Sequence, residues 1–385
     1  MSTQAAQFVS PHSTCAANLI ESAAIGVAGR IGVASEAESG MEADAGSPGR
    51  PLVGLDRHDP DPTFAAVDLG TNNCRLLIAR RAGDGLRVVD AYSRIVRLGA
   101  GVAQSGVLSE AAMRRTVSTL AVCADKVRAA GVTHSRFVAT EACRRASNAA
   151  EFVERVRAET GIELDIIPPE EEARLALAGC VPVLDPCSEH ALVFDIGGGS
   201  TEIIWTKVAA GREPEMIGWT SIPCGVVTLA ENHGGREPNA DDYKAMVAEV
   251  GEHVDAFERK YRPSRAFAAG TAQMVGISGT VTTVAAVLMD LPRYDRTRVD
   301  GTWIASADVA SVTRGLAAMT YAQRMAHPCI RRGRADLVLP GCAALEAILS
   351  AWKAERVRVA DRGLREGILR RLMGASTVVG SPVAA

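Results

Sequence analysis

The sequence predicts an α/β fold of two similar lobes, and a repeated segment is the strongest sign of it. Residues 64–78 read Phe-Ala-Ala-Val-Asp-Leu-Gly-Thr-Asn-Asn-Cys-Arg-Leu-Leu-Ile. Residues 192–204 read Leu-Val-Phe-Asp-Ile-Gly-Gly-Gly-Ser-Thr-Glu-Ile-Ile, and the two segments align with Asp68 on Asp195. Predicted strands and helices alternate along the chain after Phe64, as they do in α/β proteins. With 385 residues, 47% of them hydrophobic, the chain can bury two large cores.

Each copy of the repeat predicts a β-hairpin. An apolar strand ends in a carboxylate, a glycine-centred turn with small polar residues follows, and a second apolar strand leaves the turn. Because glycine lacks a Cβ, such a turn can bring backbone N–H groups against an anion. Thr71, Ser200 and Thr201 would add hydroxyl donors. The carboxylates of Asp68 and Asp195 would repel phosphate, so a divalent cation is expected to bridge the carboxylates and the phosphate. Two copies in register favour a phosphate site over two unrelated turns.

The first lobe is predicted to hold three strands followed by alternating helices and strands. Ser109 is a candidate N-cap for the first long helix, and Gly131 is a candidate stop for it. Ser147 is a candidate N-cap for the next helix, which is predicted to end at Gly161. The predicted elements are strands 64–70, 74–80 and 86–97, helix 109–130, strand 135–139, helix 147–161, strand 164–167 and helix 170–179.

The second lobe is predicted to repeat this order from Ala191 onward, so that the two hairpins face each other across a cleft. Gly279 and Thr280 lie between a predicted strand and a predicted helix, which would put a helix N-terminus, a common anion or nucleotide site, at the cleft. The predicted elements after the second hairpin are strand 216–222, helix 241–261, strand 272–277, helices 281–289 and 332–351, strand 356–360 and helix 364–373.

The pattern also predicts where the lobes begin and end. We expect the first lobe at 62–182, with a return helix at 361–374 that crosses back to it. The second lobe is expected at 188–358. Residues 1–61 and 375–385 are expected to form disordered tails, because they are rich in small residues and lack a periodic apolar pattern.

Composition and charge exclude several classes of partner. A net charge of −3 gives no basic field, which disfavours nucleic acid. Nine cysteines without a C-x-x-C pair are typical of reduced, mostly buried thiols. No window approaches a membrane span, and the start of the chain lacks the pattern of a signal peptide. We therefore expect a cytoplasmic protein with no nucleic-acid or membrane partner.

Charged residues outside the hairpins are candidates for catalysis. Glu170, Glu171 and Glu172 open a predicted helix, where acids complement the helix dipole. Neighbouring helical residues point about 100° apart, so one of the three can face the cleft and activate a water. Spacing alone does not say which one. Arg144 and Arg145 follow a predicted strand, and guanidinium groups suit phosphate oxygens.

Two other sets of residues are expected to be less important. Arg331, Arg332 and Arg334 are interpreted as a solvated helix start and not as a track for a polyanion. The seven histidines lie far apart in the sequence and show no metal-ligand spacing.

Several short motifs lie in order along the chain. They are Val67-Asp-Leu-Gly-Thr-Asn72, Ala139-Thr140 with Arg144 and Asn148, Glu171-Glu-Ala-Arg174, Phe194-Asp-Ile-Gly-Gly-Gly-Ser-Thr-Glu202, Ser278-Gly-Thr-Val281 and Leu364-Arg-Glu-Gly-Ile368. Together they resemble the exopolyphosphatase / guanosine pentaphosphate phosphohydrolase (Ppx/GppA) family in its short, two-domain form. The resemblance implies two ribonuclease-H-like lobes of the actin-like, sugar-kinase-like ATPase fold. It further implies a homodimer that releases orthophosphate, with Mg²⁺, from the end of inorganic polyphosphate or from guanosine pentaphosphate.

The resemblance also implies roles for particular residues. Glu172, the acid directly before Ala-Arg, would be the catalytic base, and Arg144 would hold phosphate. Asp195 and Glu202 would hold magnesium and orient the water, with Asp68 as a further acid beside the metal. Mn²⁺ is an alternative ion, since carboxylates and water suit both. The phosphate cradles would be formed by Gly70, Thr71, Asn72, Asn73, Gly197, Gly198, Gly199, Ser200 and Thr201.

Three alternatives stay open at this point. Polyphosphate and guanosine pentaphosphate present the same terminal phosphoanhydride, so the hairpins do not distinguish them. A kinase of the same fold would need an acceptor pocket, whereas the acids before Arg174 resemble those of the hydrolases. A non-catalytic protein that binds guanosine pentaphosphate would have no need of Glu172, Asp195 and Glu202 together.

Overall fold

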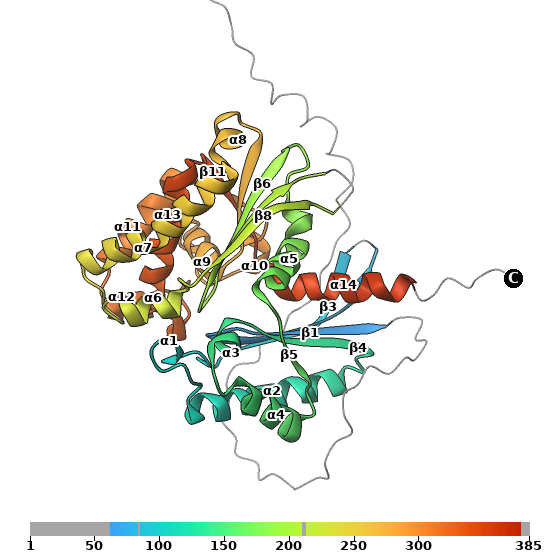
Figure 1. Cartoon of the computed structure of the whole chain (residues 1–385). Helices are drawn as coiled ribbons and strands as arrows, with labels where there is room; N and C mark the ends of the chain where they lie inside the picture. The colour runs from blue at the N-terminus through green and yellow to red at the C-terminus, as the bar shows by residue number, and fades with distance from the viewer. Residues whose placement is uncertain (1–61, 84, 210–212, 379–385) are drawn as a thin grey trace, which may run out of the picture. The chain divides into compact units, whose positions relative to one another are not determined.

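The computed structural model describes residues 62–83, 85–209 and 213–378. They form two α/β domains, each built around one mixed β-sheet (Figure 1). The predicted N-terminal tail, residues 1–61, lies outside the described residues.

The first domain has a five-stranded sheet in the order β3-β2-β1-β4-β5. Strands β1, β4 and β5 are parallel, whereas β2 runs antiparallel to both of its neighbours. The strands are β1 Thr63–Leu69, β2 Asn73–Ala82, β3 Gly85–Ile95, β4 His134–Ala139 and β5 Leu164–Ile166. The helices are α1 Val102–Ser105, α2 Glu110–Ala129, α3 Glu141–Arg145, α4 Ala149–Thr160 and α5 Pro169–Cys180.

The second domain repeats this topology and adds one strand. Its six-stranded sheet has the order β10-β11-β9-β6-β7-β8, in which β6, β9 and β11 are parallel and β7 is antiparallel to both neighbours. Strand β10 is the addition, and it pairs antiparallel with β11 at the edge. The strands are β6 His190–Ile196, β7 Thr201–Lys207, β8 Glu215–Ile222, β9 Ala272–Gly276, β10 Trp303–Ala305 and β11 Arg356–Val359. The repeat in the sequence is therefore a repeat of topology.

Helices fill the connections of the second domain and return the chain to the first. A 3₁₀ turn, η2 Val181–Val183, precedes β6, and a second one, η3 Arg332–Arg334, precedes α13. The helices are α6 Val226–Asn232, α7 Ala240–Tyr261, α8 Ser264–Ala268, α9 Gly279–Leu288, α10 Arg296–Val299, α11 Ser306–Ala318, α12 Tyr321–Ala326, α13 Val338–Trp352 and α14 Leu364–Val378.

Helix ends test the predicted caps. The side chain of Ser109 accepts a hydrogen bond from the Ala112 N–H, and Gly131 has φ 61°, so both ends of α2 are as predicted. The prediction for Ser147 is wrong, because its hydroxyl donates to the Gly106 carbonyl and Asn148 occupies the N-cap position of α4. Helix α14 continues to Val378, beyond the predicted end at Met373.

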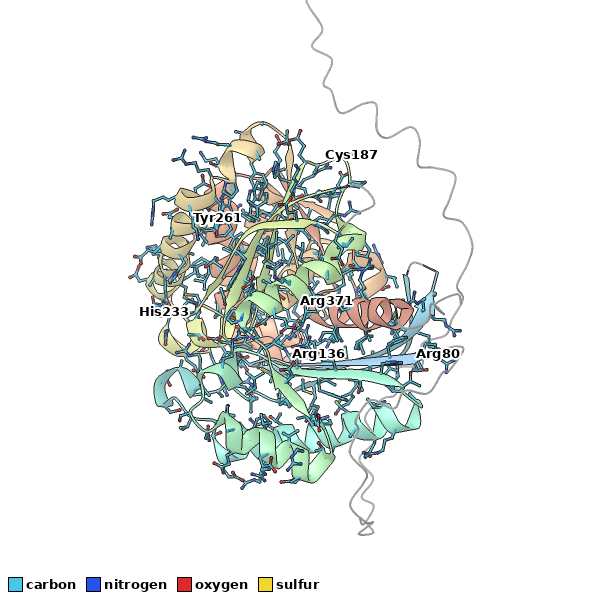
Figure 2. All side chains as sticks on the ribbon, turned by 45° about the vertical axis from the view of Figure 1, so that its right-hand side comes forward. Arg80, Arg136, Cys187, His233, Tyr261 and Arg371 are labelled. Carbon is cyan, nitrogen blue, oxygen red and sulfur yellow. The ribbon has the colours of Figure 1, made fainter. Side chains whose placement is uncertain are left out.

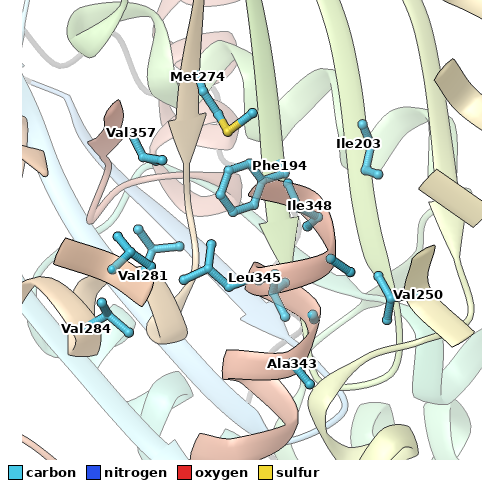
Figure 3. Close-up of a cluster of buried hydrophobic side chains, with 14 of the residues drawn as sticks. Phe194, Ile203, Val250, Met274, Val281, Val284, Ala343, Leu345, Ile348 and Val357 are labelled. Atoms are coloured by element: carbon cyan, nitrogen blue, oxygen red, sulfur yellow. The ribbon is translucent and has the colours of Figure 1, made fainter. Parts of the chain in front are cut away.

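The hydrophobic core lies in layers on both sides of each sheet. Helices α2 and α4 bury residues such as Leu120 and Phe152 against one face of the first sheet, and α14 covers the opposite face (Figure 1). Helix α5 packs on the second sheet. The largest cluster joins the other face of that sheet to α7, α9 and α13, with Phe194 and Ile348 among its members (Figure 3).

Glycines allow helices α5 and α14 to cross in close contact. A Cβ at Gly367 would lie 1.9 Å from the Leu175 carbonyl oxygen, and one at Gly179 would lie 2.0 Å from the Gly363 oxygen. Real Cβ atoms do not approach backbone atoms so closely, so both positions require glycine. The crossing places the loop before α14 beside the last turn of α5.

The structure can also be compared with the expectations of buried, reduced cysteines and of no membrane-spanning segment. Among the described residues, seven cysteines are free and buried, and Cys187 is not one of them. Within those same residues, none of the helices has the length and apolar character that crossing a membrane requires.

Candidate active site

The two hairpins have the same backbone geometry. In the first, Asp68 pairs with Arg75 across β1 and β2, and in the second Asp195 pairs with Glu202 across β6 and β7. The turns close in the same way. The Gly70 N–H donates to the Asn73 carbonyl at 2.9 Å, and the Gly197 N–H donates to the Ser200 carbonyl at 2.9 Å. The alignment of Asp68 on Asp195 made from the sequence is thus also an alignment in the two sheets.

The tips of the two hairpins touch. A Cβ at Gly198 would lie 2.9 Å from the Thr71 Cβ and 3.1 Å from the Asn72 nitrogen. A Cβ at Gly199 would lie 2.5 Å from the Thr71 hydroxyl. The glycines of the second hairpin are therefore needed for the first hairpin to come this close.

A cavity of about 540 Å³ opens beside the hairpins. Residues of both domains line it, and most of the predicted site residues are among them. These are Asp68, Gly70, Thr71, Asn72, Asn73, Glu172, Asp195, Gly197, Gly198, Gly199, Ser200 and Glu202. Thr201 and Arg144 are not part of the lining. The side chain of Thr201 is fully buried, and its hydroxyl donates to the Cys224 carbonyl at 2.8 Å.

The structure distinguishes the three acids at the start of α5. Glu170 accepts a hydrogen bond from Arg174 on the surface, and Glu171 accepts one from Arg136, which is labelled in Figure 2. Glu172 alone of the three lines the cavity. Its side chain is 14% exposed, whereas that of Glu170 is 49% exposed. Sequence spacing could not make this choice.

Arg144 holds Glu172 in place. Its guanidinium donates to the Glu172 carboxylate at 2.7 Å and to the Ile167 carbonyl at 2.9 Å. The remaining N–H groups donate to Glu141, at 3.1 and 2.9 Å. Glu141 lies on the short helix α3 and lines the cavity. In this state Arg144 is paired with two carboxylates, so its predicted contact with phosphate would require a change of partners.

Burial and mutual repulsion raise the pKa values of the acids around the cavity. Burial, and then the charge of Glu172, raise the pKa of Asp195 to about 7. Burial and the charge of Asp195 raise the pKa of Glu202 to about 7, although Ser200 and Ser221 both donate hydrogen bonds to it. Burial raises the pKa of Asp68 as well.

Glu172 shares this environment. Burial first, and then the charge of Glu202, raise its pKa well above the usual range, against the opposing charge of Arg144. Among the described residues, Glu172 is the one member of this group of four acids that forms an ion pair. The group, Asp68, Glu172, Asp195 and Glu202, therefore holds more negative charge than the surrounding protein neutralises.

This surplus charge fits a divalent cation of a particular kind. No group of three or more His, Cys, Asp or Glu side chains in the described ranges is arranged to hold a metal ion on its own. Mg²⁺ commonly takes one or two carboxylates and completes its shell with water and substrate phosphates. The donor set of Asp68, Asp195 and Glu202 suits that mode of binding and not an all-protein cage.

Basic residues also line the cavity. Arg75, Arg334 and Arg365 line it together with Arg296. Burial, with the nearby charges of Arg75 and Arg331, lowers the pKa of Arg334 to about 9. Burial also lowers the pKa of Arg365. The prediction that Arg334 belongs to a solvated helix start is wrong, because this buried guanidinium faces the cavity beside the N-terminus of α9.

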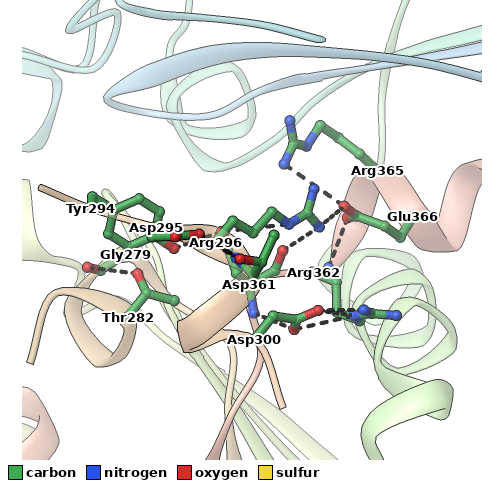
Figure 4. Close-up of polar contacts among 12 residues, drawn as sticks. Gly279, Thr282, Tyr294, Asp295, Arg296, Asp300, Asp361, Arg362, Arg365 and Glu366 are labelled. Atoms are coloured by element: carbon green, nitrogen blue, oxygen red, sulfur yellow. Dashed lines mark hydrogen bonds and ion pairs between the residues drawn. The ribbon is translucent and has the colours of Figure 1, made fainter. Parts of the chain in front are cut away.

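A polar network connects Arg296 to the start of α14 (Figure 4). Glu366 accepts hydrogen bonds from Arg296 at 2.9 Å and from the Gly363 N–H at 3.0 Å. Arg362 pairs with Asp300, and the Tyr294 hydroxyl donates to Asp361 at 2.6 Å. The charge of Arg365 and that of Arg296 keep the pKa of the buried Glu366 low. The network joins α10 of the second domain to the helix that returns to the first.

Sequence reasoning missed several residues of the cavity. Glu141 gave no signal, because a single acid after a strand is usually solvated, and Arg334 was noticed only within an arginine cluster that was interpreted as solvated. Arg75 had a signal, since it occupies the position in the first hairpin that Glu202 occupies in the second. Ser278 belongs to the motif Ser278-Gly-Thr-Val281, and its side chain caps α9 by accepting hydrogen bonds from the Thr280 and Val281 N–H groups.

Comparison with protein families identifies the chain. The model of the Ppx/GppA phosphatase family matches residues 77–376. This chain belongs to the Ppx/GppA phosphatase family. Its two domains have the actin-like ATPase fold that the sequence motifs implied, and both expectations are confirmed.

The similarity to individual relatives supports the assignment to the Ppx/GppA family. Exopolyphosphatase 2 of Mycobacterium tuberculosis is 30% identical over 326 residues, which is 80% of this chain and 98% of the relative. A guanosine-5'-triphosphate,3'-diphosphate pyrophosphatase of Photobacterium profundum is 27% identical over 332 residues, and this chain spans 61% of its length. The crystal structure of the Aquifex aeolicus Ppx/GppA family member has a TM-score of 0.69 and 28% identity, and the match covers 82% of this chain and 99% of that one.

Proposed function

We propose that this protein is an exopolyphosphatase that removes orthophosphate from the end of inorganic polyphosphate. One observation carries the proposal. A buried carboxylate, Glu172, shares a cavity with the turns of two phosphate-type hairpins. The similarity to an exopolyphosphatase over 98% of that relative's length supports the same activity.

The terminal phosphate of the chain would lie against the hairpins. The backbone N–H groups of Thr71 to Asn73 and of Gly198 to Ser200, with the hydroxyl of Thr71, would donate to its oxygens. The Gly70 and Gly197 N–H groups close the two turns, and the Ser200 hydroxyl already donates to Glu202. Thr201 would contribute through its backbone, since its hydroxyl is already bonded to Cys224. Donors fixed in this way stabilise charge that develops during phosphoryl transfer.

Glu172 would act on the attacking water. The water oxygen attacks the terminal phosphorus, and the bond from that phosphorus to the bridging oxygen breaks. The bridging oxygen keeps the bonding electrons and leaves with the shortened chain, while the proton of the water passes to the Glu172 carboxylate. A raised pKa suits Glu172 to this proton transfer near neutral pH. Arg144 and Glu141 would keep the carboxylate oriented toward the water.

Magnesium is the proposed cofactor, with manganese as the alternative. Asp195 and Glu202 would hold the ion together with substrate oxygens, and Asp68 would lie on the same side. A bound divalent ion neutralises negative charge on the phosphate and orients the water. The surroundings of Asp195 and Glu202 support the assignment, because burial and neighbouring acids raise their pKa values and a bound divalent ion would stabilise their ionised forms.

The arginines that line the cavity would bind the rest of the substrate. Arg75, Arg334 and Arg365 line the cavity, and of these three only Arg365 lies at ion-pair distance from an acid among the described residues, Glu366 at 4.0 Å. Phosphates beyond the terminal one would offer them the charge they lack. This arrangement favours a substrate with several phosphates in a row.

Guanosine pentaphosphate hydrolysis is the second candidate. The observation that favours it is an apolar part of the cavity lining, which includes Tyr294, Ile330 and Val338. A bare polyphosphate has no group that would contact such residues, whereas a nucleoside has. Binding without turnover is the third possibility, and the acids around the cavity argue against it.

The test is orthophosphate release, measured with Mg²⁺ from medium-chain polyphosphate and from guanosine pentaphosphate side by side. The Glu172→Gln variant serves as the blank. Faster release from polyphosphate is expected. Faster release from guanosine pentaphosphate would favour the second candidate, and release from neither, with tight binding of guanosine pentaphosphate, would contradict the proposed hydrolase. The homodimer and the cytoplasmic location expected from the sequence stay predictions.

A further inference from the structure

One loop of the first domain backs the first phosphate hairpin. Residues 96–99 follow β3 and form three backbone hydrogen bonds with the hairpin turn. The N–H groups of Val96 and Arg97 donate to the Asn72 carbonyl at 2.9 and 3.0 Å, and the Gly99 N–H donates to the Thr71 carbonyl at 2.9 Å. A Cβ at Gly99 would lie 2.3 Å from the Thr71 Cγ2, so the loop and the hairpin are packed without free space. The hairpin turn cannot move without this loop.

The same loop is anchored in the second domain. The Arg97 guanidinium donates to the Asp336 carboxylate at 2.8 Å and to the Gly333 carbonyl at 3.3 Å. Just beyond it, the Gly101 N–H donates to a Glu231 carboxylate oxygen at 2.8 Å. These contacts lie around a small second cavity of about 190 Å³, which shares Asn72 with the main one. Arg97 itself does not line the main cavity.

The backbone at Arg97 is unusual. It has φ 47°, a left-handed conformation that residues with a Cβ rarely adopt. Asp336 is 8% exposed, and one of its carboxylate oxygens is buried without a hydrogen-bond partner in the structure. A conformation that costs energy, together with an incompletely bonded buried acid, indicates an arrangement that is held for a reason other than stability.

We propose that Arg97 is a positioning residue that sets the spacing of the two phosphate hairpins by tying the first hairpin to the second domain. Thr71 and Asn72 are pressed against Gly198 and Gly199 by the loop that Arg97 anchors. The contact of Arg97 with Asp336 therefore favours the state in which both hairpins can bind one phosphate. This inference rests on the proposed phosphohydrolase function, and Arg97 takes no part in the chemical step.

Loss of a positioning residue is expected to raise KM and to leave kcat nearly unchanged. Without the anchor, a smaller fraction of molecules has both hairpins in place, so the apparent affinity for substrate falls by that fraction. At saturation, the substrate itself holds the hairpins together. We expect Arg97→Gln to raise the KM for inorganic tripolyphosphate about three- to tenfold and to leave kcat within about twofold, in keeping with the weak coupling of a partly exposed ion pair.

Three further variants test the interpretation. Arg97→Gly removes the guanidinium but relieves the left-handed conformation, so the same rise in KM with unchanged or higher thermal stability would assign the effect to the side chain. Arg97→Lys keeps a charge that can reach Asp336 and is expected to recover part of the affinity. Asp336→Asn combined with Arg97→Gln is expected to raise KM no more than either change alone.

Arg155→Gln is the matched control. Arg155 also pairs with two partners, Glu110 at 2.8 Å and Glu159 at 2.7 Å, but all three residues lie in the first domain. The KM of the Arg155→Gln variant should equal that of the unmodified protein. Unchanged KM in Arg97→Gln, or a loss of kcat at unchanged KM, would overturn the inference.

A binding measurement tests the positioning role of Arg97 independently of the proposed hydrolase activity. If the unmodified protein releases no orthophosphate, the proposed function fails, and the affinity for tripolyphosphate measured by calorimetry replaces KM. Weaker binding by Arg97→Gln would then still support the positioning role. Equal binding by Arg97→Gln and the unmodified protein would overturn it.

Discussion

Adjacent residues of the same type have different environments in this protein. Glu171 and Glu172 follow one another in α5, yet the first pairs with Arg136 outside the cavity and the second lies inside it. Burial and the charge of Glu202 raise the pKa of Glu172, and Arg144 keeps it oriented. Its proposed role as the base depends on these surroundings and not on the residue type.

Glu202 is the residue whose replacement tests the metal site. Changing Glu202 to Gln keeps the acceptor for Ser200 and Ser221 but removes the negative charge. We expect the Mg²⁺ concentration for half-maximal activity to rise at least about tenfold, as it does when groups around a metal are removed. A magnesium titration of orthophosphate release measures this. The exposed Glu163→Gln is the control, and a titration for Glu202→Gln that overlaps the control would remove Glu202 from the metal site.

The hairpin residues could be predicted from the sequence, but the position of Arg334 could not. Asp68, Asp195 and the glycines of the turns belong to a local pattern that repeats, so their proximity follows from the repeat. Arg334 reaches the cavity because the 3₁₀ turn η3 packs beside α9, a contact between segments far apart in the chain. Such contacts leave no trace in local spacing, and an arginine in a loop is ordinarily solvated.

The contact between helices α5 and α14 links the two domains. Helix α5 carries Glu172 at its start and packs on the second sheet, while α14 packs on the first sheet. The two helices meet at Gly179 and Gly367, where backbone atoms approach without intervening side chains. The position of Glu172 relative to the hairpins therefore depends on this crossing.

Gly367→Ala is expected to destabilise the protein by about 1–3 kcal/mol, the usual cost of overpacking. The new Cβ would lie 1.9 Å from the Leu175 carbonyl oxygen, a backbone atom that cannot turn aside. Thermal unfolding measures the change. Gly251→Ala in α7 is the control, since nothing lies within 4 Å of its Cβ position, and it should be neutral or stabilising. Equal melting temperatures for the two variants would contradict the proposed role of the crossing.

Several long elements lie where the sequence pattern predicted them, although the 13-residue helix α11 was not predicted. Helices α2 and α7 and the strands of both hairpins lie close to their predicted ranges, because apolar periodicity and capping residues define them locally. Short elements such as α3 and β10 were not predicted. Helix α3 spans Glu141–Arg145 and β10 spans Trp303–Ala305, too few residues for a period to be recognised.

At the scale of the whole molecule, the active site is a product of duplication. Each domain contributes one hairpin, and the copies have diverged so that Arg75 in one stands where Glu202 stands in the other. Acidic and basic side chains therefore both line the cavity. The first domain contributes Asp68, Arg75 and Glu172 to the cavity lining, and the second contributes Asp195, Glu202 and Arg334.

The buried acids should make the stability of the metal-free protein depend on pH. The folded-state pKa values of Asp195 and Glu202 are about 7, above their values of about 4 in an unfolded chain. A carboxyl whose pKa is raised by folding contributes stability that is fully present below about pH 4 and is lost as the pH rises through about 7.

Lowering the pH from 8 to 6 in the presence of a chelator should therefore raise the free energy of unfolding by about 1–2 kcal/mol. Mg²⁺ is expected to reduce this dependence, because it stabilises the ionised acids. Denaturant unfolding at both pH values measures it, and Asp195→Asn is expected to show a smaller change. The same pH dependence in Asp195→Asn and in the unmodified protein would contradict the assignment of the charge surplus to these acids.

The rate of orthophosphate release by Glu172→Gln, compared with Glu171→Gln, tests the central claim most directly. The two changes are the same in chemistry and one residue apart, but only Glu172 lines the cavity. We predict that Glu172→Gln still binds polyphosphate and loses about 100- to 10,000-fold in kcat, the range for loss of a general base. Glu171→Gln should keep the rate of the unmodified protein. A Glu172→Gln variant that retains most of its rate, or an equal loss in both variants, would contradict the account.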